Sequence, residues 1–132
     1  MKLLDTTVLV DLLRRQEAAQ RIVQSMEEAG ERGGTTEVNA FELLLGAYRR
    51  GRLDPGRRAD VERLLDRIDV LALDRRGAAR AAEILSKLHA DGRDIGVLDA
   101  LIAGIALAYG YETIVTRDEG FHRVPGLQVQ TY

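Results

Sequence analysis

Four acidic residues, far apart in the sequence, stand where their carboxylates could do chemistry together. Each lies near the end of a predicted strand or the start of a predicted helix, and they are Asp5, Glu42, Asp99 and Asp118. In an open α/β sheet, ligands bind beyond the carboxyl ends of the strands, at the point where the strand order reverses. If the four acids converge there, they form an all-oxygen site, which is the ligand set that hard cations such as Mg²⁺ or Mn²⁺ prefer.

Asp99 has the most unusual surroundings of the four. It is the only charged residue in the stretch GVLDALIAGIALAYG, residues 96–110. An ionised carboxylate without a partner in apolar surroundings is costly or becomes protonated. We therefore expect Asp99 to reach solvent, to find a hydrogen-bond donor or to bind a metal ion.

Each acid, taken alone, also has a purely structural interpretation. Asp5 could cap the helix that follows it, and Glu42 stands three residues after Asn39, which matches a capping box. Asp118 could cap a turn, and the dipole at a helix N-terminus could stabilise Asp99. The sequence leaves these alternatives open for the single residues, but the placement of all four favours one shared site.

The elements that must position these acids alternate between strands and helices. Apolar periodicity and turn signals predict strands at 2–4, 35–38, 69–73, 112–116 and 127–131, and helices at 6–15, 17–29, 39–48, 55–67, 75–89 and 96–109. This alternation predicts a three-layer α/β/α sandwich with a mainly parallel central sheet. The chain has no repeat, low-complexity tract or linker, so we expect one domain over residues 1–132.

Composition agrees with a soluble globular domain. A chain of 132 residues can bury roughly two thirds of the surface that it exposes when unfolded. The absence of cysteine excludes disulfides, thiolate metal sites and cysteine nucleophiles. Asp5 and Asp11 interrupt the apolar N-terminal segment, and the longest apolar run is too short for a bilayer. We therefore expect no membrane association and a cytoplasmic location.

Four segments together resemble the PIN-domain ribonucleases, and in particular the VapC toxins of prokaryotic toxin-antitoxin pairs. The segments are LLDTTVLVDLL, VNAFELLLGAYR, IGVLDALIAGIALAYG and IVTRDEGFHRVPGLQV. They cover nearly the whole chain in the order and spacing of the family, and the first and third are the most specific. The resemblance implies the PIN fold, and it also implies a shared role for the four acids.

Under this resemblance, the acids Asp5, Glu42, Asp99 and Asp118 are the ligands of a catalytic Mg²⁺ ion, with Mn²⁺ as an alternative. The hydroxyl of Thr116 belongs to the same catalytic set, and Thr6 is a polar neighbour that could assist. One position departs from the family pattern, because Gly120 stands where a second acid often precedes the Phe. In the last motif, Asp118 is then the only acid that matches the family's metal ligands. We interpret nearby Asp94 as a helix cap or a surface residue.

The activity that the resemblance implies is hydrolysis of RNA phosphodiester bonds by water, without a covalent enzyme intermediate. Clustered carboxylates repel one another, so at least one of them should have a raised pKa in the absence of metal. The family also implies a small VapB-like antitoxin that covers the site, often with a cationic side chain among the acids, and a homodimer.

Arginines are the candidate contacts to the RNA backbone. The net charge of −2 does not itself indicate a nucleic-acid partner, but all basic residues except two lysines are arginine, which suits phosphate recognition. The candidates are Arg14, Arg15, Arg49, Arg50 and Arg52. A solvated surface is the alternative for these residues. His89 and His122 have no partner at a recognisable spacing, so surface or core roles are favoured for both.

The sequence leaves two other classes of function open. A phosphoryl-acceptor or phosphohydrolase domain also gathers acids at strand ends. However, a receiver domain needs a lysine late in the fold, and only Lys2 and Lys87 exist. A haloacid-type phosphatase needs an Asp two residues after Asp5, where Thr7 stands. The third class is a non-catalytic binding module on the same fold, against which the presence of all four acids argues.

Overall fold

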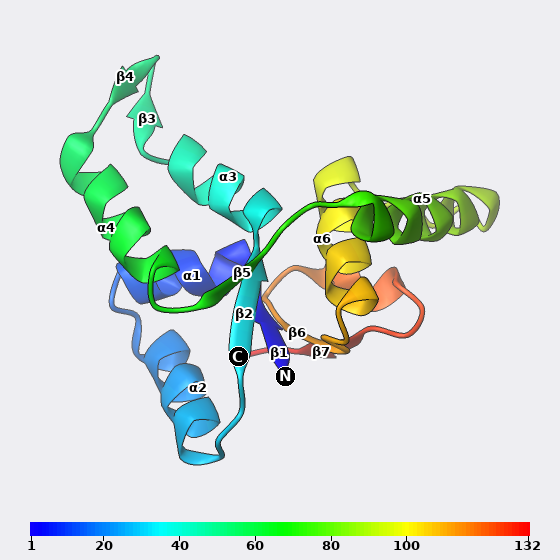
Figure 1. Ribbon diagram of the computed structural model, residues 1–132, viewed down its shortest axis with the longest axis horizontal. Helices are drawn as coiled ribbons and strands as arrows, with labels where there is room; N and C mark the ends of the chain where they lie inside the picture. Colours follow the sequence, from blue (N-terminus) through cyan, green and yellow to red (C-terminus); the bar gives the residue numbers. More distant parts are fainter.

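A five-stranded sheet in which every strand pair is parallel forms the centre of the computed structural model, which describes residues 1–132 (Figure 1). The strands are β1 (Lys2–Leu4), β2 (Gly33–Thr36), β5 (Asp69–Leu71), β6 (Thr113–Val115) and β7 (Gln128–Gln130). Their order in the sheet is β5-β2-β1-β6-β7. The predicted mainly parallel sheet is therefore confirmed.

Helices cover both faces of this sheet, as the α/β/α prediction requires. On one side lie α1 (Thr6–Leu13), α2 (Glu17–Glu28) and α4 (Pro55–Leu65), and on the other lie α5 (Arg75–Ala90) and α6 (Val97–Ala108) (Figure 1). Helix α3 (Glu37–Leu45) contributes to both apolar clusters, with Val38 in one and Leu43 in the other. None of the helices combines the length and the hydropathy that a membrane span needs.

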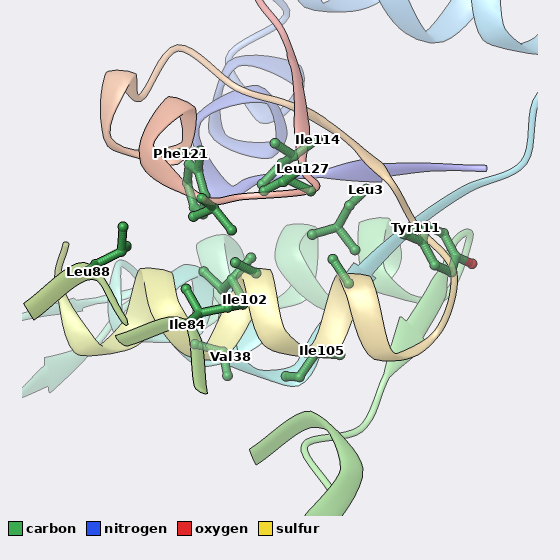
Figure 2. Packing of buried hydrophobic residues seen from close by; sticks show 13 residues of the cluster. Leu3, Val38, Ile84, Leu88, Ile102, Ile105, Tyr111, Ile114, Phe121 and Leu127 are labelled. Atoms are coloured by element: carbon green, nitrogen blue, oxygen red, sulfur yellow. The ribbon is translucent and has the colours of Figure 1, made fainter. Parts of the chain in front are cut away.

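Alternation along the central strands separates the two cores. In β1, Leu3 packs in the cluster with α5 and α6, whereas Leu4 packs in the cluster with α1, α2 and α4. Their register partners on β6, Ile114 and Val115, divide in the same way. Figure 2 shows the first of these clusters between α6 and the strands. Strands that are buried on both faces explain the uninterrupted apolar runs at these positions.

The junction between β2 and α3 lies two residues earlier than predicted. Thr36, and not Asn39, is the N-cap, because its Oγ1 accepts from the backbone N–H groups of Val38 and Asn39, both at 3.1 Å. The side-chain oxygen of Asn39 accepts in return from the N–H of Thr36 at 3.3 Å. The capping box therefore joins Thr36 to Asn39, and the predicted box of Asn39 and Glu42 is wrong.

A second difference is the hairpin that follows α3. The sequence predicted that the helix continues to residue 48 and ends in a turn, whereas β3 (Tyr48–Arg49) pairs antiparallel with β4 (Arg52–Leu53). The two connecting residues both have positive φ, +52° at Arg50 and +77° at Gly51. This is the two-residue turn that matches the twist of a hairpin.

The predicted helix starts at Asp54 and Asp74 are confirmed. Asp54 accepts from the N–H of Arg57 at 3.2 Å and Asp74 from the N–H of Gly77 at 3.0 Å. The segment between β6 and β7, predicted as a turn-rich connection, contains the short 3₁₀ helix η1 (Glu119–Arg123).

Helices α5 and α6 approach each other closely because glycine stands at their contact. A Cβ atom on Gly104 would lie 2.5 Å from the backbone nitrogen of Ala81, and one on Gly77 would lie 2.9 Å from Cγ1 of Ile105. Neither atom could be accommodated without separating the helices. Since α6 also carries Asp99, this contact sets the position of one predicted site residue.

Replacing Gly104 with Ala should lower the free energy of unfolding by about 1–3 kcal/mol, because the added methyl group meets backbone that cannot move aside. Urea denaturation of the wild type and of Gly104→Ala measures this difference. Gly56→Ala in α4 is the matched control, since its Cβ would meet only Oδ1 of Asp54, at 3.5 Å. There, helix propensity should leave stability unchanged or raise it by up to ~1 kcal/mol. Equal stability of both variants would contradict the close contact.

Candidate active site

The strand order reverses at β1, and the candidate site lies at this reversal. From β1 the chain builds outward through β2 and β5 on one side and through β6 and β7 on the other. Asp5 follows β1 and Thr116 follows β6, and the register pairs Leu4 with Val115 immediately before them. The two residues therefore stand side by side at the carboxyl end of the sheet, where α/β proteins bind ligands.

Asp5 is buried, with 4% of its surface exposed, and donors from two different elements bind its two oxygens. Thr116 Oγ1 donates to Oδ2 at 2.7 Å, and Asn39 Nδ2 donates to Oδ1 at 3.1 Å. Asp5 occupies the N-cap position of α1 without making a side-chain cap hydrogen bond. The capping alternative for Asp5 is therefore wrong, and its carboxylate is oriented by Thr116, which follows β6, and by Asn39 on α3.

Asn39 is a site residue that the sequence analysis missed. It is fully buried, and its side-chain amide nitrogen donates to Thr6 Oγ1 at 3.0 Å in addition to Asp5. Its side-chain oxygen accepts from Thr36 Oγ1 at 2.8 Å, which fixes the direction of the amide. The available signal was its position three residues before Glu42, on the same face of a helix.

Glu42 lies on the next turn of α3 and receives a hydrogen bond from Thr6. Thr6 Oγ1 donates to Oε1 of Glu42 at 2.8 Å, so the Thr6 hydroxyl connects Glu42 to Asn39. Thr6 begins α1, which follows β1. Glu42 lies on α3, which follows β2, the strand next to β1 in the sheet. This contact brings Glu42 to the same sheet edge as Asp5.

Asp118 is held by the corner that joins β6 to η1. Its backbone N–H donates to Thr116 Oγ1 at 2.9 Å, and its Oδ1 accepts from the N–H of Gly120 at 2.8 Å. One carboxylate oxygen therefore does cap η1, as the structural alternative expected. A Cβ at residue 120 would lie 3.2 Å from this oxygen, so the glycine that departs from the family pattern leaves Asp118 room.

Asp99 connects electrostatically to all three other acids. It is half-buried in the first turn of α6, and its pKa is raised to about 7 by burial and then by the charges of Asp118, Asp5 and Glu42. Every contribution acts in the same direction, and no basic side chain opposes it. The structure therefore brings the four predicted acids close enough for their charges to act on one another.

Burial also raises the pKa values of Asp5 and Glu42. For Asp5, the hydrogen bonds from Thr116, Asn39 and the N–H of Thr6 lower the pKa and partly offset burial, while the charge of Asp118 raises it further. For Glu42, the hydrogen bond from Thr6 lowers the pKa, and the charges of Asp5 and Asp118 raise it. The raised pKa expected for clustered carboxylates is therefore found at three of the four acids.

The donor set fits a hard divalent cation in charge and in atom type, because carboxylate oxygens are gathered without a protein cation among them. Yet no three of the chain's acidic or histidine side chains are arranged to hold one ion together. The carboxylates repel one another, and hydroxyl and amide donors of the protein already orient Asp5, Glu42 and Asp118.

The structure does not bring the five candidate arginines together. All are exposed; Arg14 and Arg15 follow the far end of α1, about 12 Å along the helix from the acids. Arg15 lines a groove of about 710 Å³ between α1 and α4. Arg49, Arg50 and Arg52 lie on the β3–β4 hairpin, which projects beyond α3 and α4 (Figure 1). Neither group is among the charges that shift the pKa values of the acids.

The two histidines and Asp94 lie at the surface and outside the acid cluster. His89 is exposed and pairs with Asp94, whose backbone oxygen accepts from Arg123 Nη1 at 2.7 Å. His122 is also exposed, with Nε2 at 3.9 Å from Oε2 of Glu119. Neither histidine is positioned as a base for this site.

Comparison with known proteins identifies close likeness over almost the whole chain. The family model described as "PIN domain" matches residues 2–127. A "tRNA(fMet)-specific endonuclease VapC" of Shigella flexneri is 27% identical over 130 residues, covering 98% of this chain and 96% of that protein. The "plasmid stability protein StbB" of Pseudomonas syringae pv. tomato is 33% identical, with the same coverage. A solved structure, VapBC2 from Rickettsia felis bound to a promoter DNA fragment, superposes with a TM-score of 0.86 at 19% identity and covers 99% of this chain and 98% of that one.

Replacing Asp99 with Asn should stabilise the metal-free protein at pH 8 and have less effect at pH 5. The pKa of Asp99 is about 7 in the folded protein against an ordinary value of 3.8. Between these values the folded state binds more protons than the unfolded state, so this residue's contribution to stability falls as the pH rises. Asn cannot ionise and avoids that loss. For a half-buried group, solvent screening limits the gain at pH 8 to about 1–2 kcal/mol.

Thermal denaturation in the presence of a chelator, at both pH values, measures this effect. Glu27→Gln is the control, because Glu27 is exposed on α2, away from the acid cluster, and should show no such pH dependence. A loss of stability in Asp99→Asn that is equal at pH 5 and pH 8 would contradict the electrostatic coupling.

Proposed function

This chain belongs to the PIN domain family, and we propose that it is a divalent-metal-dependent endoribonuclease that hydrolyses RNA phosphodiester bonds. One observation supports this proposal: four acids from separate elements lie close enough together that, beyond burial, the charges of Asp118, Asp5 and Glu42 raise the pKa of Asp99. Relatives of nearly the same length bear the names endonuclease and ribonuclease, which supports the reaction class.

The ion would be held by Asp5, Glu42, Asp99 and Asp118, with Mg²⁺ as the proposed metal and Mn²⁺ as an alternative. When bound, it supplies charge that binds a phosphate oxygen, lowers the pKa of the attacking water and stabilises the leaving oxygen. The protein's own part is to hold the carboxylates in place. Thr116 and Asn39 orient the two oxygens of Asp5, and Thr6 orients Glu42.

The same electrostatics explain why an RNA phosphate would need the ion. A phosphodiester is anionic, and the cluster presents several carboxylates and no basic side chain. Repulsion would therefore keep the substrate from the metal-free site, and a bound divalent cation would offset part of the negative charge and offer a phosphate oxygen a positive centre. We propose separately that arginines contact the RNA backbone. The candidates are Arg14 and Arg15 after α1 and the arginines of the β3–β4 hairpin.

The phosphoryl-acceptor alternative lacks its cation. Lys2 begins β1, at the opposite end of the strand from Asp5, and its Nζ lies 4.0 Å from Glu31. Lys87 is exposed on α5, and its Nζ lies 3.5 Å from Asp91. Neither lysine contributes to the pKa values of the acids, so a role beside a phosphorylated aspartate is disfavoured.

We further propose a VapB-like antitoxin as a partner, which would make this chain the toxic component of a toxin-antitoxin pair. The solved neighbour from Rickettsia felis is such a VapBC assembly. An acid cluster without its own cation has the charge that would accept a positively charged side chain from a partner. Such a side chain would occupy the place of the ion and block the substrate.

A homodimer is supported by an exposed apolar patch on α3 and the hairpin. The patch consists of Phe41, Leu45, Tyr48 and Leu53, which are 40–58% exposed, and the first three of them line a groove of about 330 Å³. Glu37 lies at the start of α3, and the arginines of β3 and β4 lie beyond its end. Two copies packed antiparallel about a two-fold axis would therefore place acidic against basic ends.

Asp5→Asn and Asp99→Asn should each abolish RNA cleavage, with losses of at least about 100-fold, and should abolish growth inhibition when expressed. Each removes a negative charge from the proposed ligand set without changing its shape. Cleavage of an RNA mixture with Mg²⁺, with chelator, and with Mn²⁺ restored tests both the residues and the ion. Asp94→Asn is the matched control, because Asp94 pairs with His89 at the surface. Full activity of either site variant would reject the proposed function, and trapping of an acyl phosphate would favour the alternative.

Leu45→Glu should convert a dimer to monomers, because it places a charge at the most exposed residue of the patch. Light scattering coupled to size-exclusion chromatography measures the mass. Leu73→Glu serves as the control, since Leu73 is 44% exposed but follows β5, outside the patch. Loss of the dimer in both variants, or in neither, would count against this interface.

A further inference from the structure

Asp11, Arg117 and Tyr132 form a cluster that the proposed reaction does not use. Asp11 is on α1 and is 7% exposed, Arg117 follows Thr116, and Tyr132 lies beyond β7. Nη2 of Arg117 lies 3.1 Å from Oδ1 and 2.9 Å from Oδ2 of Asp11, and the hydroxyl of Tyr132 donates to Oδ2 at 2.7 Å. Three segments are thus joined around one buried carboxylate.

Tyr132 also contacts the arginine directly. Nε of Arg117 donates to the Tyr132 hydroxyl at 3.2 Å, and the guanidinium lies 5.7 Å from the centre of the ring. Asp11 has both oxygens bound, and the guanidinium is restrained by the carboxylate, the hydroxyl and the aromatic face. The position of the arginine is therefore defined although much of its side chain is exposed.

The backbone of the same arginine is bound by α1 as well. The N–H of Arg117 donates to Thr7 Oγ1 at 3.1 Å. Thr7 and Asp11 are four residues apart and so share one face of α1. Helix α1 therefore binds Arg117 twice, through the main chain at Thr7 and through the side chain at Asp11.

These contacts continue into the acid cluster. The hydroxyls of Thr7 and Thr116 lie 3.2 Å apart, and Thr116 already donates to Asp5. Since a hydroxyl has one proton, Thr7 must be the donor to Thr116. The Thr116 oxygen accepts from the N–H of Asp118 too. A continuous chain of hydrogen bonds thus runs from Arg117 to Asp5 and Asp118.

We propose that Arg117 and Tyr132 are positioning residues for the acid site. Together with Asp11 they hold the corner between β6 and η1 against α1, and so fix the spacing of Asp118, on that corner, from Asp5, at the start of α1. This inference rests on the proposed metal site, because the spacing of the carboxylates matters only if they bind a common ion. The arginine acts through its neighbours in the chain and touches neither ion nor substrate.

The test measures Mn²⁺ binding by calorimetry, alongside thermal stability and RNA cleavage as a function of metal concentration. Arg117→Ala should weaken Mn²⁺ affinity about 10-fold, as loss of a residue that orients metal ligands does. Tyr132→Phe, which keeps the ring under the guanidinium and removes only the hydroxyl, should weaken it less. Arg117→Lys should restore part of the loss. Cleavage should shift to higher metal concentration by the same factor and recover at saturation.

Arg32→Ala is the matched control. Arg32 also pairs with an aspartate, its Nε lying 2.7 Å from Oδ2 of Asp69, but this pair precedes β2 and begins β5, at the opposite end of the sheet. Its replacement should leave Mn²⁺ affinity unchanged. Lower melting temperatures of Arg117→Ala and Tyr132→Phe with unchanged Mn²⁺ affinity would overturn the proposal, and so would a wild-type protein that binds no Mn²⁺. A wild type that binds Mn²⁺ but leaves RNA intact would reject the nuclease proposal alone.

Discussion

The buried carboxylate of Asp5 is the constraint on which the site depends. A charge at the end of the central strand needs donors, and they come from elements on both sides of β1, from Thr116 after β6 and from Asn39 on α3. Both can reach it only if β6 and β2 flank β1 in this parallel order. The hydrogen bonds of the Asp5 carboxylate therefore depend on the strand order of the sheet.

The other three acids add electrostatic repulsion to the cost of burying Asp5. Glu42, Asp99 and Asp118 add negative charge to the partly buried carboxyl edge of the sheet. No basic side chain of the protein offsets the effect of this charge on the pKa values of Glu42 and Asp99. The fold maintains this repulsion through neutral donors, namely hydroxyls, an amide and backbone N–H groups. Neutral donors orient carboxylates without cancelling their charge, which would preserve the attraction for the proposed cation. Under that proposal, stability is exchanged for a preorganised binding site.

The sequence carried enough information for the sheet and for the placement of the four acids near its carboxyl edge, because both follow from local patterns. Apolar runs locate β1 and β6, and the residues that follow them fall at the carboxyl edge of any parallel sheet. Thr116 and Thr6 were expected beside the acids, but the contacts of Asn39 and Arg117 were not. Asn39 was assigned to a helix cap, since its donors act on Asp5 and Thr6 across the fold, and Arg117 gave no signal because its partners lie 106 and 15 residues away. The hairpin was missed because Arg50 adopts positive φ, where glycine or asparagine is the usual signal.

The large sequence separation between Asp5 and Thr116, which are joined by a hydrogen bond, affects when the site can form during translation. The two residues are 111 positions apart, and β1 and β6 pair over a similar separation. Contacts of such high sequence separation form late, after the local helices. On the ribosome, β1 can pair with β2 early, but its other neighbour, β6, is missing until nearly all of these residues have been translated. The acid cluster therefore cannot assemble before β6 and Asp118 have been translated, and the order of translation delays any activity of the site until then.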